Sequence, residues 1–184
     1  MGLAVLTKED LPHYTYDDYI KWEGRWEIIK GIRCAMVPAA TIKHQEISAR
    51  INGQLYRLLQ DCRRCTPLLP VDWQIGEDTV VQPDNLVVCE EIPADRKLSI
   101  PPVLVFEVIS PETEKKDRDL KFDLYREAEV KYYCIVDPVG KSADVYALQG
   151  DKYKEMEFFP EGKVVFDLGP CFIHFDFNEV LDIY

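Results

Sequence analysis

Two acidic residues and a lysine occupy positions from which they could support phosphodiester hydrolysis. Asp84 follows Pro83 at the start of one apolar segment, and Glu107 interrupts a second, Val103–Ile109, whose composition is typical of a buried central strand. A carboxylate in such a strand is costly unless a metal ion or a lysine pairs with it. Lys121 lies in the helix expected directly after that strand. Together these residues predict a metal-dependent phosphodiesterase site.

Such a site needs charge neutralisation at the phosphate and an activated water. Hard cations such as Mg²⁺ and Mn²⁺ prefer oxygen ligands, so Asp84 and Glu107 are the expected metal ligands. A bound ion polarises the phosphoryl oxygen and makes its water a better nucleophile. Lys121 would stabilise the developing negative charge or position the attacking water. Asp117, Lys121 and Tyr125 recur at four-residue intervals, so one helical face could present the lysine to the carboxylates.

Each of these residues also has a simpler explanation that involves no catalysis. Asp84 could serve only to form a turn after proline. Glu107 and Lys121 could form a structural ion pair inside the protein. The Lys115–Lys116 pair with Arg118 could be either a solvated helix face or a stripe that contacts DNA.

The elements that would position these residues form a mixed sheet with flanking helices. The segment from Val103 to Val136 reads as a strand, a helix running to about Ala128 and a second strand, which predicts a right-handed parallel crossover. A helix over Ile42–Asp61, capped by Thr41, carries an amphipathic stripe that should pack on the sheet. The other strands look antiparallel, so the expected class is α/β in the mixed α+β sense. Further elements are expected as a short helix over Tyr16–Glu23 and strands over Arg25–Lys30, Ile32–Val37, Pro67–Ile75, Asn85–Cys89, Ala143–Leu148, Lys152–Phe158, Val164–Phe166 and Phe172–Ile173.

Length and composition indicate a globular protein with a single domain, residues 1–184. Hydrophobic residues make up 47% of the chain, which argues against disorder. No apolar run approaches the ~20 residues of a membrane span, and the first residues lack the features of a signal peptide, so a cytoplasmic protein is expected. The net charge of −11 opposes spontaneous adhesion to nucleic acid. It does not exclude a nuclease, because local basic patches and bound metal ions can offset it.

The six cysteines are not expected to form disulfides in a cytoplasmic protein. Cys34, Cys89, Cys134 and Cys171 lie in or beside apolar segments, which is typical of small buried hydrophobic residues. The remaining pair, Cys62–Cys65, is a lone C-x-x-C motif. A structural zinc site requires a second pair of ligands at suitable spacing, and none is evident in the sequence.

Several blocks of the chain recur together in one known family. They are Trp26–Gly31, His44, Gln82–Val88, Phe106–Pro111, Asp117–Tyr125 and Tyr132–Pro138. In these blocks the chain resembles the bacterial Uma-type family, a branch of the PD-(D/E)xK, or restriction-endonuclease-like, superfamily. The resemblance extends from about Thr15 to Leu148. The order and spacing of the separate blocks make it specific, whereas Pro-Asp alone would not be.

This resemblance implies a restriction-endonuclease-like core, often assembled as a homodimer, that binds metal and acts on DNA. Asp84 matches the family's Pro-Asp acid, and Glu107 matches its second acid. The superfamily's usual lysine would stand at Ile109, two residues after that acid and on the same face of the strand. Isoleucine cannot do this work, and the family's lysine instead matches Lys121 on the following helix.

Two more residues gain a candidate role from the same resemblance. Glu27 matches an acid on the first hairpin that would add a third carboxylate, although it could be an ordinary exposed strand residue. His44 matches a histidine at the start of the long helix, although it could be a satisfied histidine on an apolar face. Lys30 departs from the family, which usually has an acid before the hairpin glycine, so no role is assigned to that position.

Three hypotheses follow from the sequence. The first is a Mg²⁺- or Mn²⁺-dependent endonuclease that cleaves DNA, with Asp84, Glu107 and Lys121 at its centre and Glu27 assisting. The second is a non-catalytic binding or assembly module that keeps the nuclease fold and locks Glu107 to Lys121 in an ion pair. The third is a metal-dependent hydrolase of small phosphate esters, which the modest basic charge would suit. Metal binding separates the first hypothesis from the second.

Overall fold

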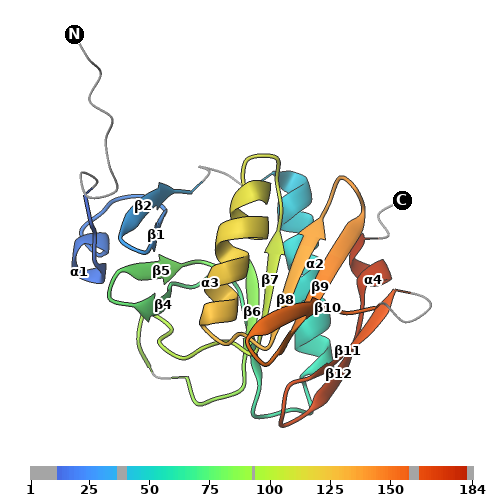
Figure 1. The fold of residues 1–184 in the computed structure, drawn as a ribbon. Helices are drawn as coiled ribbons and strands as arrows, with labels where there is room; N and C mark the ends of the chain where they lie inside the picture. Colours follow the sequence, from blue (N-terminus) through green and yellow to red (C-terminus); the bar gives the residue numbers. More distant parts are fainter. Residues whose placement is uncertain (1–11, 37–40, 93, 158–161, 182–184) are drawn as a thin grey trace.

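The structure is a computed structural model that describes residues 12–36, 41–92, 94–157 and 162–181 (Figure 1). The helices are α1 (Tyr16–Tyr19), α2 (Ile42–Leu58), a π-helical segment η2 (Lys116–Lys121), α3 (Phe122–Glu127) and α4 (Phe177–Leu181). The strands are β1 (Trp26–Ile29), β2 (Ile32–Ala35), β3 (Thr66–Leu68), β4 (Trp73–Gly76), β5 (Thr79–Val81), β6 (Asn85–Val88), β7 (Leu104–Val108), β8 (Tyr132–Asp137), β9 (Ser142–Gln149), β10 (Lys152–Glu155), β11 (Lys163–Asp167) and β12 (Phe172–Asp176).

The strands form a six-stranded sheet and two smaller ones. The large sheet has the order β10-β9-β8-β7-β6-β3, the second sheet has the order β2-β1-β5-β4, and β11 pairs with β12. In the large sheet β7 and β8 are parallel, and the other neighbours are antiparallel. This arrangement confirms the expected mixed α+β class and the expected parallel strand–helix–strand unit. No helix among the described residues is both long and apolar enough to cross a membrane.

Strand β7 contributes to two cores, one on each face of the large sheet. Leu104, Phe106 and Val108 pack with α2, α4 and the β11-β12 hairpin. Val105 and Ile109 pack with α3. Side chains alternate along a strand, so residue 107 faces α3 together with residues 105 and 109. Figure 1 shows α3 and α2 on opposite faces of the sheet.

Helix α2 begins as the sequence predicts and ends earlier. The Thr41 side chain accepts a hydrogen bond from the His44 backbone N–H at 3.1 Å, which is the contact of an N-cap. The stripe Ile47, Ile51 and Leu55 is buried against the sheet. The cap fixes His44 in the first helical turn, beside the end of β7.

Three expected elements differ from the structure. Pro67–Ile75 is not one strand, because its ends belong to different sheets as β3 and β4. The helix after β7 begins at Glu114 and passes at Lys116 into a π-helical segment that the sequence did not predict. Helix α1 ends at Tyr19 rather than near Glu23. Pro70 explains why Pro67–Ile75 is divided, since proline interrupts the ladder of strand hydrogen bonds. The apolar residues on either side of it nevertheless suggested one continuous strand.

The cysteine expectations are wrong for four of the six residues. The structure joins Cys62 to Cys171 and Cys65 to Cys89. Free thiols are found only at Cys34 and Cys134 among the described residues. The sequence separations of 109 and 24 residues explain why no local pattern revealed these pairs.

Candidate active site

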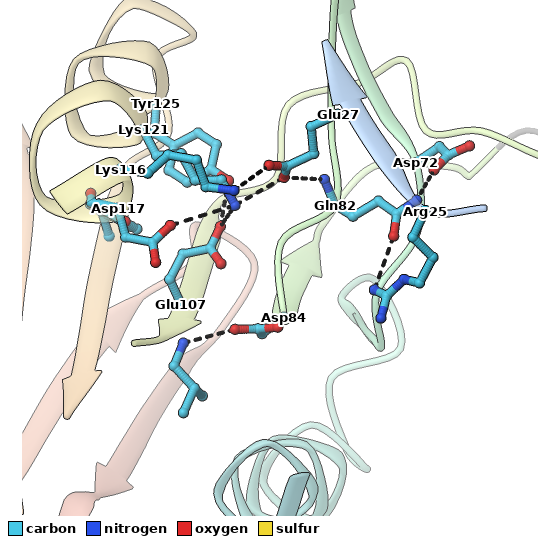
Figure 2. Close-up of polar contacts among 12 residues, drawn as sticks. Arg25, Glu27, Asp72, Gln82, Asp84, Glu107, Lys116, Asp117, Lys121 and Tyr125 are labelled. Carbon is cyan, nitrogen blue, oxygen red and sulfur yellow. Dashed lines mark hydrogen bonds and ion pairs between the residues drawn. The ribbon is translucent and has the colours of Figure 1, made fainter. Parts of the chain in front are cut away.

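Glu107 lies at the centre of the candidate site, on the face of β7 that meets the following helix. Its carboxylate is buried. The oxygen Oε1 accepts a hydrogen bond from Lys121 Nζ at 2.8 Å and another from the Tyr125 hydroxyl at 2.6 Å (Figure 2). Both contacts use one oxygen, which leaves Oε2 able to bind a further partner.

Glu27 brings a second buried carboxylate from the smaller sheet. Its Oε1 lies 3.0 Å from Lys121 Nζ and accepts a hydrogen bond from the Gln82 backbone N–H at 3.1 Å, and its Oε2 accepts one from Lys116 Nζ at 2.7 Å. Burial raises the pKa of Glu27, but the ammonium groups of Lys121 and Lys116 outweigh burial and lower this pKa to about 2. Glu27 is therefore anionic, and Lys121 links it to Glu107 across the two sheets.

Lys121 is a cation held by several carboxylates. Burial lowers its pKa, but Glu107, Glu27 and Asp117 outweigh burial and raise it well above the ordinary value. A lysine that keeps its proton can stabilise negative charge but cannot act as a base. It ends the π-helical segment η2, a wide turn that is frequent at functional sites.

Asp84 is placed by the segment that joins β5 to β6. Its Oδ2 accepts a hydrogen bond from the Val108 backbone N–H at 2.9 Å and lies 3.1 Å from His44 Nε2. Burial lowers the pKa of His44, but its hydrogen bond to Asp84 and the charge of Asp84 outweigh burial and raise this pKa. The first contact fixes Asp84 beside the end of β7, one residue beyond Glu107 (Figure 2).

Asp117 supplies a further carboxylate on the same side of the sheet. Its Oδ1 is buried and has no hydrogen-bond partner among the described residues, and it lies 3.7 Å from Lys121 Nζ. In Figure 2 this carboxylate points toward Lys121 and Glu107. The contact with Lys121 is thus longer than a hydrogen bond, and a buried oxygen without a hydrogen bond is costly, so a bound cation would give Asp117 a closer partner.

Of these side chains, all but Glu27 and Tyr125 line one cavity of about 230 Å³. A water molecule takes up ~30 Å³ in the liquid, so the cavity has room for an ion with its waters or for a phosphate group. The charged residues that line it are Arg25, Asp84, Glu107, Glu112, Lys116, Asp117 and Lys121, with His44 beside them.

Negative charge exceeds positive charge around Glu107. Burial raises the pKa of Glu107, and the positive charge of Lys121 lowers it. The negative charges of Asp117 and Asp84 raise it further, and the resulting pKa is about 8. Burial also raises the pKa of Asp117. A divalent cation would supply the charge that these carboxylates otherwise obtain by keeping protons. The carboxylates Glu27, Asp84, Glu107 and Asp117 face the two ammonium groups of Lys116 and Lys121.

The structure brings together all five site residues predicted from the sequence, which are Glu27, His44, Asp84, Glu107 and Lys121. The Lys121 amine lies on the same side of the sheet as Glu107, with which it forms an ion pair. The alternative that Glu27 is an exposed strand residue is wrong, because its side chain is 0% exposed. Two residues were not assigned from the sequence, Asp117 and Lys116. The four-residue spacing from Asp117 to Lys121 was the available signal for the first.

The alternative that Lys115, Lys116 and Arg118 form a stripe that contacts DNA finds little support in the structure. The half-buried Lys116 pairs at 2.7 Å with the buried Glu27. Arg118 forms ion pairs with Glu114 at 3.0 Å and with Asp144. Both cations are thus engaged by carboxylates of the same chain.

Three comparisons place this chain among known proteins. The family model Uma2, described as "Putative restriction endonuclease", matches residues 16–170. The "Uncharacterized protein slr1290" of Synechocystis sp. is 30% identical over 150 residues, which cover 76% of this chain and 77% of that protein. A crystal structure from Anabaena variabilis, titled a "putative nuclease belonging to DUF820", matches with a TM-score of 0.76 at 16% identity and covers 92% of this chain and 98% of that one.

Because the sequence identity to the Anabaena variabilis structure is low, the structural likeness establishes the fold alone. It confirms the prediction of a central mixed sheet with helices on its faces. The family match spans most of the chain, including every residue of the candidate site. The family's description supports a nuclease-like function as the coarse conclusion. By the extent of the family match and the identity to the Synechocystis protein, this chain belongs to the Uma2 family.

Proposed function

We propose that the protein is a metal-dependent endonuclease that hydrolyses DNA phosphodiester bonds at the cavity beside Glu107. The single observation that carries this proposal is the burial of Glu107 among carboxylates that outnumber the lysines around it. Burial first, and then the charges of Asp117 and Asp84, raise the pKa of Glu107 to about 8. The family description supports the choice of a nucleic acid as substrate. The resemblance also implies a homodimer, which sedimentation equilibrium would test.

The residues present fit a hard divalent cation. Glu107 and Asp84 each use one carboxylate oxygen for the contacts described, so each can offer the other. Asp117 Oδ1 is a further oxygen without a hydrogen-bond partner among the described residues. We assign Asp84 and Glu107 as the ligands of Mg²⁺ or Mn²⁺, with Asp117 as an additional candidate. When bound, the ion would polarise the phosphoryl oxygen and activate water.

The remaining residues would orient and balance these groups. Lys121 keeps its proton and would stabilise negative charge that develops on the phosphate. Glu27 holds Lys121 and Lys116 in place through contacts of 3.0 and 2.7 Å. His44 would orient Asp84 through its contact of 3.1 Å. Lys121 thus corresponds in role to the lysine that the superfamily places on the strand.

Cleavage assays on duplex DNA with Mg²⁺ or Mn²⁺ test the proposal. The Glu107→Gln substitution should lower cleavage by at least ~10²-fold because it removes a charged metal ligand, while the fold is kept. The control is Glu90→Gln, at an exposed acid outside the cavity, which should cleave like the wild type. Full activity in Glu107→Gln would overturn the proposal. Hydrolysis of a nucleotide ester without cleavage of DNA would instead support an esterase of small phosphates.

A second candidate function is supported by the ion pair between Lys121 and Glu107, which is complete in the structure at 2.8 Å. In that case the protein would be a non-catalytic binding or assembly module that keeps the nuclease fold. A purely structural pair needs no metal ion. The binding of Mn²⁺ by the wild type is therefore the observation that separates the two functions.

A further inference from the structure

Four cysteines from three distant segments converge at the end of the large sheet. Cys62 and Cys65 lie in the loop between α2 and β3, Cys89 directly follows β6, and Cys171 directly precedes β12. The sulfur atoms of Cys62, Cys65 and Cys171 all lie within 4.8 Å of one another. Cys89 joins the same group through its bond to Cys65. The two cysteine pairs therefore form one cluster.

The contact between the two pairs matches the geometry of a metal thiolate. The sulfur of Cys171 lies 3.8 Å from that of Cys65, although these residues belong to different pairs. In a tetrahedral zinc site with Zn–S bonds of ~2.3 Å, neighbouring sulfurs are ~3.8 Å apart. Two disulfides that only cross-linked the chain would not need to have their sulfur atoms in contact with each other. A shared ion gives a reason for the sulfurs of Cys62, Cys65 and Cys171 to meet, and Cys89 adjoins them through Cys65.

The local chain around Cys62 and Cys65 also suits a metal site. Their spacing is C-x-x-C, which is typical of structural zinc ligands. The Cys65 backbone N–H donates to the Cys62 carbonyl oxygen at 3.1 Å, so the loop turns and presents both sulfurs on one side. Between them, Arg63 and Arg64 are exposed cations that would offset part of the negative charge of a tetrathiolate.

We propose that the reduced chain binds one Zn²⁺ through these four cysteines. Loading the site from the disulfide-paired state requires reduction of both S–S bonds with four electrons and four protons. Two phosphine molecules supply the electrons and become phosphine oxides, and two water molecules supply the protons and the oxide oxygens. The ion then displaces the four thiol protons and is held by four thiolates. The missing second ligand pair of the C-x-x-C motif is supplied by Cys89 and Cys171, which only the fold brings near.

The ion would have a structural role, separate from the candidate active site. None of the four cysteines lines the cavity beside Glu107. A closed set of four cysteine ligands is characteristic of structural zinc rather than catalytic zinc. The site would tie the β11-β12 hairpin to the end of α2 and to β6, across a sequence separation of 109 residues between Cys62 and Cys171.

Metal titration of the full chain tests this inference. The protein would be reduced with a phosphine under anaerobic conditions, freed of metal with a chelator and titrated with Co²⁺. We expect one equivalent to produce the sulfur-to-cobalt charge-transfer band and the strong visible absorption of tetrahedral cobalt. One equivalent of Zn²⁺ should remove both signals and raise the melting temperature of the reduced protein. The absence of the charge-transfer band in the folded, reduced wild type would overturn the proposal.

Matched variants distinguish this site from other thiols and from the carboxylates. Cys89→Ser and Cys171→Ser should bind zinc at least ~10²-fold more weakly, because each removes one of the four ligands. Cys34→Ser changes a free cysteine outside the cluster and should bind like the wild type. Glu107→Gln should also keep the band, so a failure of the proposed nuclease function leaves this test unaffected. An unchanged band in Cys171→Ser would contradict the four-cysteine assignment.

Discussion

Asp117 is the residue whose surroundings most need an explanation. Its Oδ1 is buried without a hydrogen-bond partner among the described residues, 3.7 Å from Lys121 Nζ. Leaving such a group without a hydrogen bond costs ~1–3 kcal/mol, and the ion-pair contact with Lys121 offsets only part of this cost. The residue follows directly after Lys116, which is itself bound to Glu27. A carboxylate that lowers the stability of the protein at this position is best explained by a role in binding a cation.

The Asp117→Asn substitution should therefore separate binding from stability. We expect Mn²⁺ affinity to fall by ~10-fold or more, since one negative charge leaves the site. The free energy of unfolding without metal should stay the same or rise, because repulsion of Glu107 is relieved. Calorimetry and urea unfolding measure the two quantities. Asp119→Asn, at an exposed residue of the same helical segment, should change neither.

Glu27 gives a prediction for stability at acid pH. Its pKa is lowered from 4.5 to about 2, so its ionisation stabilises the fold above pH ~4.5, and this contribution is lost as the pH falls toward 2. A difference of this size corresponds to ~3 kcal/mol. Glu27→Gln should be destabilised relative to the wild type at pH 7, and the gap should shrink as the pH falls. Urea unfolding across this range measures the difference. A gap that is constant with pH would contradict this account of Glu27.

At the scale of elements, the lysine proposed for catalysis can come from the helix because that helix covers the face of β7 from which Glu107 projects. Residue 109 points to the same face, where the superfamily carries its lysine and this chain has a buried isoleucine. The strand and the helix thus offer two routes by which an ammonium group can reach Glu107. Only the helical route is used here, with a contact of 2.8 Å.

Moving the lysine tests whether the two routes are equivalent. Lys121→Met should lower cleavage by ~10²–10³-fold, as expected when a stabilising group is removed from the transition state. Adding Ile109→Lys to that variant should recover at least ~10-fold, because the new ammonium group would face Glu107. Adding Val108→Lys instead would point the lysine into the opposite core and should recover nothing. Equal activities of the two double variants would show that position on the strand is irrelevant.

The element scale also shows what the sequence could and could not predict. The parallel β7-β8 unit, the capped helix α2 and the meeting of Glu107 with Lys121 followed from apolar periodicity and four-residue spacing. The division of Pro67–Ile75 between two sheets did not, because partner choice is a long-range property. The cysteine cluster was missed for the same reason, since Cys89 and Cys171 carry no local sign of their partners. Asp117 had the right spacing, but burial is what distinguishes it from a solvated helix acid.

At the scale of the whole molecule, a net charge of −11 makes a bound cation more important for any encounter with DNA. The cations nearest the cavity are largely engaged within the chain, as Lys116 and Lys121 both contact Glu27. A divalent ion would reduce the local negative charge where a phosphate has to enter. Metal binding is thus expected to come before nucleic-acid binding, and the two should be linked.

The most direct test of this account is calorimetric titration of the wild type with Mn²⁺ between pH 6 and pH 9. Because the pKa of Glu107 is raised to about 8 in the absence of metal, binding should release protons below that pH, and the affinity should increase as the pH rises toward it. Comparing buffers with different ionisation enthalpies measures the proton release. The account predicts proton-linked binding that Glu107→Gln weakens by at least ~10²-fold. Absence of Mn²⁺ binding, or binding unchanged in that variant, would contradict it.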